Sequence, residues 1–416
     1  MATIAEKILS NRSVEKKKLG AGEITECEVD YLMVNDVTGV PAFEVFEELG
    51  MPMIREKVIV IADHYVPNKD VPSAEQAKRL RDYAIRYGIE NYYWPGFGGV
   101  CHQVMIEEGF AAPGRLIVGA DSHTCSYGAL GAFSTGIGST EAAAVMATGK
   151  LWFRVPETQR FIVEGEPGRY VSGKDIILHI IGDIGVSGSL YKAQEFYGSA
   201  IRSLSIADRI TICNMAVEAG AKAGIIPPDD STFEYLRGRV RGVYTPVYAD
   251  EDAEYEDTFT YDASEIPPTV ARPFLPENTI PARELDVAID QAYLGSCTNG
   301  RIEDLRVAAS ILRGRKVSRD VRMIIVPASQ KVYLQALKEG LIEVFLSAGA
   351  FVSGPTCGAC LGGYMGVLGE GEVCVASTNR NFIGRMGHKD SLVYLASPAV
   401  VAASAIRGRI TDPNDL

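Results

Sequence analysis

The sequence predicts an α/β fold with largely parallel sheets, divided into more than one domain. At 416 residues the chain exceeds the size at which a single hydrophobic core usually splits. Short β-branched runs alternate with stretches of helical periodicity, an order typical of parallel strands joined by helical crossovers. A hydrophobic content of 47% with 23% charged residues is ordinary for a soluble globular protein.

Individual elements follow from local pattern. Helical periodicity predicts helices over residues 74–87, 141–153 and 302–312. Apolar, β-branched runs predict strands over residues 58–62, 116–120, 210–213, 292–294, 323–326 and 373–376. The apolar stretch 392–406 is interrupted by Ser397-Pro398, which predicts the N-cap and first residue of a buried helix.

Composition changes between residues 250 and 281. An acidic segment is followed there by five prolines, which cannot all occupy helix or sheet. We interpret this segment as a link into a C-terminal domain that begins near Ala282.

Charge and cysteine content limit the classes of function. The net charge of −12 argues against nucleic acid or an anionic membrane as a partner. The N-terminus lacks a signal-peptide pattern, and no apolar run approaches the roughly 18–20 residues of a membrane span. Eight cysteines without a secretory signal indicate reduced thiols, so we expect a cytoplasmic protein.

Polar residues follow four of the predicted strands directly. They are Asp63-His64, Asp121-Ser122-His123, the segment around Cys297, and Ser377-Thr378-Asn379-Arg380. Ligands of open α/β sheets bind beyond the carboxyl ends of the strands. The sequence therefore predicts that these four strand ends form one polar crevice.

Three cysteines in glycine-rich segments indicate a metal centre. Cys297 lies in GSCTNGR, and Cys357 and Cys360 form a C-x-x-C pair in GPTCGACLGG. Three protein thiolates leave one coordination position open for water or substrate. A zinc-stabilised structural site and buried packing cysteines are the alternatives, although no second C-x-x-C or H-x3–5-H completes a zinc set.

Three histidines lie in polar contexts. His64 follows Asp63, His102 lies in Cys-His-Gln, and His123 follows Asp121-Ser122. A neighbouring carboxylate raises the pKa of an imidazole and orients the ring, which suits proton transfer to a leaving hydroxide. Ordinary hydrogen-bonded loop histidines are the alternative.

Two arginines and one glutamate complete the candidate residues. Arg380 and Arg385 suit the two carboxylates of a dicarboxylate, or else form solvated salt bridges. Glu218 is expected at the start of a helix, as a cap or as a group that orients water. The glycine-rich segment 128–140 lacks a P-loop ending, so we infer no nucleotide.

Together, seven ordered motifs resemble the aconitase superfamily, and most closely its branch of isopropylmalate dehydratase and homoaconitase large subunits. The resemblance covers nearly the whole chain. The motifs are DHYVPNK (63–69), CHQ (101–103), GADSHTCSYGALGAF (119–133), CNMAVEAGAKAG (213–224), GSCTNGRIEDLR (295–306), GPTCGACLGG (354–363) and STNRNFIGR (377–385).

The resemblance implies three α/β/α domains around one [4Fe–4S] cluster, with domains 1 and 2 in residues 1–281 and domain 3 in residues 282–416. It implies Cys297, Cys357 and Cys360 as the cluster ligands. The catalytic residues that it implies are Asp63, His64, His102, Asp121, His123 and Glu218. The substrate-binding residues that it implies are Ser122, Asn214, Asn379, Arg380 and Arg385.

The same resemblance implies a hydro-lyase that interconverts 2- and 3-isopropylmalate in leucine biosynthesis. The family's swivelling domain has no counterpart in this sequence, so we expect a separate small subunit to supply it. Homoaconitase or a dimethylmalate- or methylmalate-type hydro-lyase, acting on another hydroxy di- or tricarboxylate, is the first alternative. A cluster-sensing RNA-binding protein is a remote one.

Overall fold

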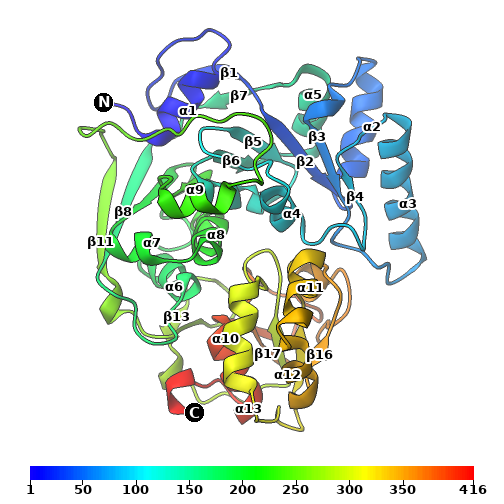
Figure 1. The fold of residues 1–416 in the computed structure, drawn as a ribbon, viewed down its shortest axis with the longest axis vertical. Helices are drawn as coiled ribbons and strands as arrows, with labels where there is room; N and C mark the ends of the chain where they lie inside the picture. Colours follow the sequence, from blue (N-terminus) through cyan, green and yellow to red (C-terminus); the bar gives the residue numbers. More distant parts are fainter.

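Three largely parallel β-sheets organise the computed structural model, which describes residues 1–416 (Figure 1). Residues from the first two sheets form the upper part of the molecule in Figure 1, and the third sheet lies below them with the last helices of the chain. One cluster of 45 buried apolar residues draws members from all three sheets. The sheets are therefore held against one another by a continuous core.

The first sheet has five parallel strands in the order β4-β3-β2-β5-β6. Its strands are β2 (Tyr31–Asn35), β3 (Val58–Ile61), β4 (Tyr92–Tyr93), β5 (Leu116–Gly119) and β6 (Phe133–Gly136). The helices in this part of the chain are α2 (Gly39–Leu49), α3 (Val71–Arg86), α4 (Cys101–Glu107) and α5 (Ser139–Thr148). This part of the chain also contains an antiparallel pair of strands and one further helix. They are β1 (Ile24–Glu28), β7 (Lys150–Arg154) and α1 (Ile4–Arg12).

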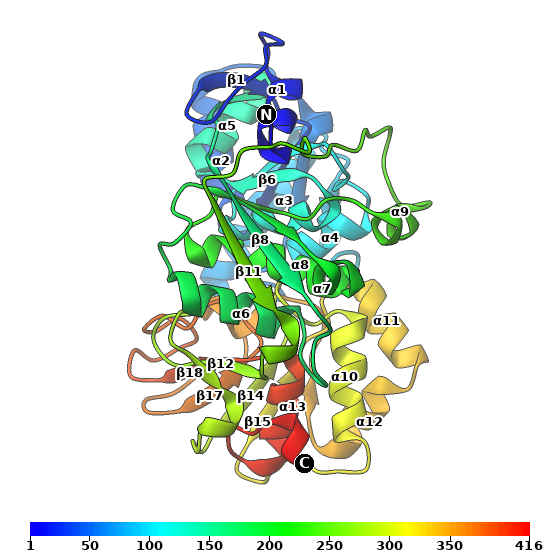
Figure 2. The ribbon, with the colours of Figure 1, turned by 90° about the vertical axis from the view of Figure 1, so that its left-hand side faces the viewer.

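The second sheet has four parallel strands in the order β10-β9-β8-β11. They are β8 (Thr158–Glu164), β9 (Ala193–Tyr197), β10 (Ala223–Ile225) and β11 (Asp257–Asp262). The associated helices are α6 (Gly173–Ile184), α7 (Ser199–Ser203), α8 (Ile206–Met215) and α9 (Asp230–Leu236). Figure 2 shows β8 and β11 running side by side between the first sheet and the lower part of the molecule.

The third sheet has seven strands in the order β13-β12-β18-β17-β14-β15-β16, of which β12 pairs antiparallel with both of its neighbours. Its strands are β12 (Thr269–Ala271), β13 (Thr279–Pro281), β14 (Gln291–Leu294), β15 (Arg322–Ile325), β16 (Phe351–Val352), β17 (Val373–Ala376) and β18 (Leu392–Leu395). Its helices are α10 (Ile302–Leu312), α11 (Gln330–Lys338), α12 (Leu341–Ala348) and α13 (Pro398–Arg407). The domain division at residue 281 stays a prediction. Two strands of this sheet, β12 and β13, come from the part of the chain before that division.

Short 3-10 helices occur in the connections. They are η1 (Arg55–Lys57), η2 (Ser122–Leu130), η3 (Ala216–Ala219), η4 (Ala263–Glu265), η5 (Ala282–Glu284), η6 (Gly358–Leu361) and η7 (Pro413–Asp415). None of the helices is both long and apolar enough to cross a membrane.

The predicted fold class is confirmed. The α/β order and parallel sheets are present, the helix at 302–312 and the strand at 373–376 coincide with α10 and β17, and Ser397-Pro398 begins α13. Strand 58–62 and helix 74–87 are also found, with ends shifted by a few residues.

Three element predictions were wrong. The helix expected over 141–153 ends at Thr148, because Gly149 adopts a left-handed conformation (φ 67°) and the chain then enters β7. Residues 210–213 are β-branched but lie inside α8, whose start is capped by Ser205. The segment expected as a link, 250–281, contains β11, β12 and β13.

Candidate active site

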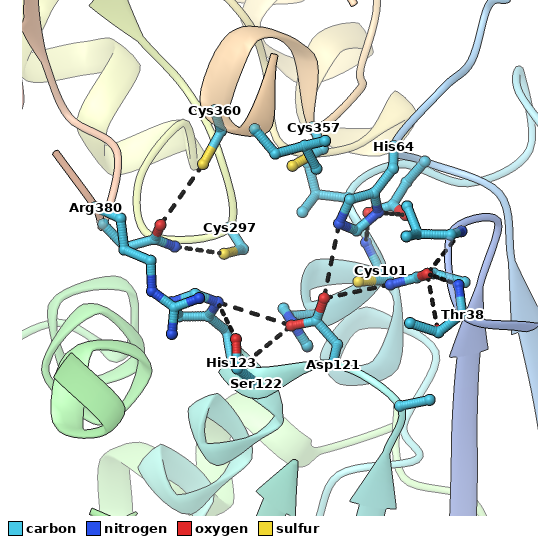
Figure 3. A pocket seen from close by; sticks show the side chains of 18 of the residues that line it. Thr38, His64, Cys101, Asp121, Ser122, His123, Cys297, Cys357, Cys360 and Arg380 are labelled. Carbon is cyan, nitrogen blue, oxygen red and sulfur yellow. Dashed lines mark hydrogen bonds and ion pairs between the residues drawn. The ribbon is translucent and has the colours of Figure 1, made fainter. Parts of the chain in front are cut away.

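A cavity of about 370 Å³ lies where the carboxyl ends of strands from the first and third sheets meet (Figure 3). It is lined from both sides, by residues that follow β3 and β5 and by residues that follow β14 and β17. The predicted crevice at four strand ends is thereby confirmed. Of the candidate residues, all but Asn214 and Glu218 line it; these two lie directly behind the lining.

The three candidate cysteines share one end of this cavity. Cys297 follows β14, Cys357 directly precedes η6 and Cys360 lies within it, and all three are buried free thiols. The side-chain amides of Asn214 and Asn379 donate to Cys297 Sγ at 3.3 and 3.2 Å. Asn379 Oδ1 lies 3.6 Å from Cys360 Sγ. Both asparagines therefore fix sulfur positions.

The thiols differ in acidity. The hydrogen bond from Cys357 lowers the pKa of Cys360 to about 5, and the nearby Arg385 guanidinium adds to the lowering. Burial raises the pKa of the Cys297 thiol. Cys360 is thus the thiol that ionises most readily, as the first ligand of a metal must.

This donor set fits an iron–sulfur cluster held by three cysteines. Sulfur ligands, amide N–H donors aimed at sulfur, and a backbone that allows close approach are what such clusters require. Gly358, between the cysteines, has φ 62°, and a Cβ there would collide with the Tyr293 hydroxyl. Arg385 Nε is buried without a hydrogen-bond partner beside the cavity, which leaves it available to an anionic group.

His64, which Figure 3 shows beside Cys357, forms a tight pair with Asp63 in the turn after β3, and the backbone N–H of Cys357 donates to the carbonyl oxygen of Asp63 at 2.8 Å. His64 Nδ1 lies 2.6 Å from Asp63 Oδ1. Burial lowers the pKa of His64, but the charge and hydrogen bond of Asp63 outweigh it and raise the pKa to about 10. The ring is therefore an imidazolium at neutral pH.

The turn that carries this pair is held by a residue that the sequence analysis missed. The Asp36 carboxylate accepts from the backbone N–H groups of Asp63, His64 and Tyr65 at 3.0, 2.9 and 2.7 Å. Asp36 follows β2 directly, so the strand-end pattern could have identified it, together with its neighbour Asn35, which lines the cavity.

His102 is fixed on both ring nitrogens. Nε2 lies 2.9 Å from Asp121 Oδ1, and Nδ1 lies 2.9 Å from the hydroxyl of Tyr127, a buried residue of the motif 119–133 that the sequence analysis did not single out. Burial raises the pKa of Asp121, but the charge of His102 and its hydrogen bonds to histidines outweigh it and hold the pKa well below the usual range. Asp121 is thus ionised between His64 and His102.

His123 contacts Glu218, which in turn contacts Arg380. His123 Nε2 lies 2.7 Å from Glu218 Oε1, and Arg380 Nε donates to Glu218 Oε2 at 3.0 Å. Burial raises the pKa of Glu218, but its bonds to His123 and Arg380 lower it below the ordinary value. Glu218 lies in the first turn of η3, a short 3-10 helix directly after α8, as predicted for a residue at the start of a helix.

The remaining candidates occupy the same wall. Ser122 Oγ lies 3.4 Å from His123 Nδ1 and lines the cavity beside Arg380 and Arg385. Lys174 of α6, missed by the sequence analysis, is fully buried and donates to the carbonyl oxygens of Ser377 and Thr378. It supports the segment that presents Asn379 and Arg380.

Comparison with known proteins gives one consistent family. The model of the Aconitase family (aconitate hydratase) matches residues 6–286 and 281–408. The 3-isopropylmalate dehydratase large subunits of Halothermothrix orenii and Thermodesulfovibrio yellowstonii are each 54% identical to this chain over 417 residues, covering 100% of this chain and 99% of each relative. The 3-isopropylmalate dehydratase large subunit 1 of Pyrococcus abyssi is 54% identical over 419 residues, with the same coverage.

Among solved structures, the holo-form of aconitase X from Thermococcus kodakaraensis superposes with a TM-score of 0.53 at 14% identity. The match covers 86% of this chain and 84% of that one, and it supports the fold alone. The seven motifs, the α/β architecture and the full-length matches agree. The chain belongs to the aconitase family.

Proposed function

We propose that this chain is the large, catalytic subunit of a hydro-lyase of the 3-isopropylmalate dehydratase type. It interconverts 2- and 3-isopropylmalate by loss and re-addition of water, within leucine biosynthesis in the cytoplasm. The names of relatives at 54% identity support this activity. The observation that carries it is the single cavity in which three thiols face carboxylate-paired histidines and two arginines.

Cys297, Cys357 and Cys360 would hold a [4Fe–4S] cluster, one per chain. When bound, such a cluster supplies a Lewis-acidic iron with an open coordination position. Family membership supports an iron–sulfur cofactor, and the soft donor set and amide N–H groups described above fit it.

His64 is the group we assign to proton donation. Its raised pKa keeps the ring protonated at neutral pH, and it lines the cavity. Hydroxide is a poor leaving group, so a proton delivered to the departing oxygen lowers the barrier to C–O cleavage. In the reverse direction the neutral ring of His64 accepts a proton from water.

Arg380 and Arg385 are the groups we assign to substrate carboxylates. Guanidinium groups bind carboxylates in a bidentate manner. Arg380 is oriented from behind by Glu218, and Arg385 Nε has no partner within the chain. Ser122 and Asn379 line the same cavity and can hydrogen-bond the bound acid.

A small subunit would complete the site. The relatives are named large subunits, which supports a separate partner chain. We assign removal of the carbon-bound proton, and selection of the isopropyl group, to that partner.

The test uses the chain reconstituted anaerobically with iron and sulfide and mixed with a small subunit. We expect hydration of the isopropylmalate alkene intermediate by the complex and little or no turnover by the large chain alone. Cys357→Ser should lose both cluster and activity. Cys27→Ser is the matched control, because Cys27 is a buried thiol that donates to Leu9 O far from the cavity.

Two results would contradict the proposal. Activity of Cys357→Ser with normal iron content would remove the cluster assignment, and zinc without iron or acid-labile sulfide would indicate a structural metal site. A panel that includes homoaconitate and methylated malates decides the substrate within the hydro-lyase class.

A further inference from the structure

Arg301 is a buried arginine that lies behind the cavity. It ends the segment that carries Cys297, directly before α10, and only 4% of its surface is exposed. Its Nη2 donates to the carbonyl oxygen of Cys297 at 2.8 Å, and its Nη1 donates to that of Thr298 at 2.7 Å. Both bonds fix the backbone of a candidate cluster ligand.

The third bond of Arg301 crosses to the opposite side of the site. Its Nε donates to Gln103 Oε1 at 3.0 Å, and Gln103 is the neighbour of His102 in α4. The Gln103 amide then donates to Glu107, whose same oxygen accepts from Ser329 Oγ at the start of α11. One guanidinium therefore joins the cysteine segment of the third sheet to the helix that carries His102.

Arg301 forms no close ion pair with a carboxylate, and the Asp304 carboxylate acts on its charge only at longer range. All three of its hydrogen bonds go to neutral oxygens, and Asp304, the nearby acid, is occupied by the backbone N–H groups of Gly300 and Arg301 and by the Asn299 amide. An unpaired buried cation is costly, so a compensating negative charge is expected close by. Thiolates on Cys297 and its neighbours would supply it.

We propose that Arg301 is a positioning residue for the dehydration site. Its guanidinium holds Cys297 at a fixed distance from His102, and its positive charge offsets the negative charge of the thiolate-bound group. This inference rests on the proposed function. It explains why this position has an arginine and not a lysine. The guanidinium group donates to three acceptors that lie in different directions, which a single ammonium group is less suited to do.

Three variants separate geometry from charge. Arg301→Met removes both, Arg301→Lys keeps the charge but loses the guanidinium group, and Arg306→Met is the control. Arg306 lies in α10, five residues after Arg301, but it is exposed and pairs with Glu339. Each chain is reconstituted anaerobically, the reduction potential of its cluster is measured, and kcat and KM are determined after addition of the small subunit.

We expect Arg301→Met to lower the reduction potential, because loss of a positive charge disfavours the added electron, and Arg301→Lys to restore most of the shift. Both should reduce kcat about tenfold or more with little change in KM, since Arg301 does not line the substrate cavity. Arg306→Met should match the wild type in all three quantities.

The inference is overturned if Arg301→Met has normal cluster content with wild-type potential and kcat. If that variant takes up no cluster, Arg301→Lys decides: a reduced kcat at near wild-type potential supports the inference, and a wild-type kcat contradicts it. Measurement of the wild-type chain in parallel distinguishes a failure of the Arg301 proposal from a failure of the proposed function. Lack of cluster or activity there would contradict the proposed function itself.

Discussion

Each of the three cavity histidines is paired with a carboxylate, but the pairs differ in what they leave free. His64 has one nitrogen against Asp63 and presents the other toward Asp121 at 3.6 Å. His102 is bonded on both nitrogens, and His123 is held by Glu218 and Ser122. Of the three, His64 is therefore the ring best able to exchange a proton with a ligand.

The raised pKa of His64 predicts a pH-dependent contribution to stability. Its pKa is 6.5 in the unfolded chain and about 10 when folded, so the stabilisation is full below pH 6.5 and is lost as pH rises toward 10. The free energy of unfolding of wild type minus His64→Gln should fall by on the order of 1 kcal/mol per pH unit across this window. Urea unfolding of the metal-free chain at pH 6.5, 8 and 9.5 measures it.

A difference between wild type and His64→Gln that stays constant over this range would show that the ring is neutral in the folded chain. His388→Gln is the matched control. That histidine lies in a partly exposed loop near Asp390, outside the cavity, and the variant shows the effect of removing a histidine that is not part of the site.

At the scale of elements, strands with polar endings were predictable, whereas pattern alone did not separate every strand from a helix. A short apolar run followed by charged residues is a local signal, so β3, β5, β14 and β17 and their polar endings could be identified from sequence. Residues 210–213 are equally β-branched, yet the Ser205 cap and burial against the core place them in α8. Here tertiary packing outweighs β propensity.

The candidate residues that the sequence analysis missed share another property. Tyr127, Lys174 and Arg301 act on the site through backbone carbonyls or through another side chain; Tyr127 and Arg301 lie within two of the seven motifs, but the pattern does not show what they contact. Asp36 differs, because it follows a strand and carries the same signal as Asp63. Residues that line a site can be found from motifs, whereas those that support it require the fold.

The turn η6 offers a test at this scale. Gly358→Ala places a Cβ against the Tyr293 hydroxyl and forces φ 62° on a residue that disfavours it. We expect a loss of about 1 kcal/mol or more in unfolding free energy and reduced uptake of iron and sulfide. Gly371→Ala is the matched control, since it has φ 73° but open space around it.

Gly371→Ala should therefore show the cost of the left-handed backbone without the collision and take up iron normally. Equal iron content in the two variants would mean that the Cys357–Cys360 turn tolerates displacement, and that its backbone does not fix the sulfur positions.

At the scale of the whole molecule, the site exists only because two sheets meet. The cysteines come from the third sheet, while His64 and His123 come from connections of the first sheet (Figure 3). His102 comes from α4, which belongs to the same part of the chain. Arg301 forms a bond across this junction, and Lys174 of α6 bonds the helices of the second sheet to the third. Neither half of the molecule alone would bring sulfur ligands and proton donors together.

The central claim is that three thiolates hold a cluster whose remaining iron is open to substrate. Mössbauer spectroscopy of the chain reconstituted with ⁵⁷Fe, before and after addition of 3-isopropylmalate, tests it most directly. We predict a [4Fe–4S] signal in which one iron alone changes its parameters when the acid binds. A sample without a cluster, or a cluster in which every iron is unaffected by the acid, would contradict the account.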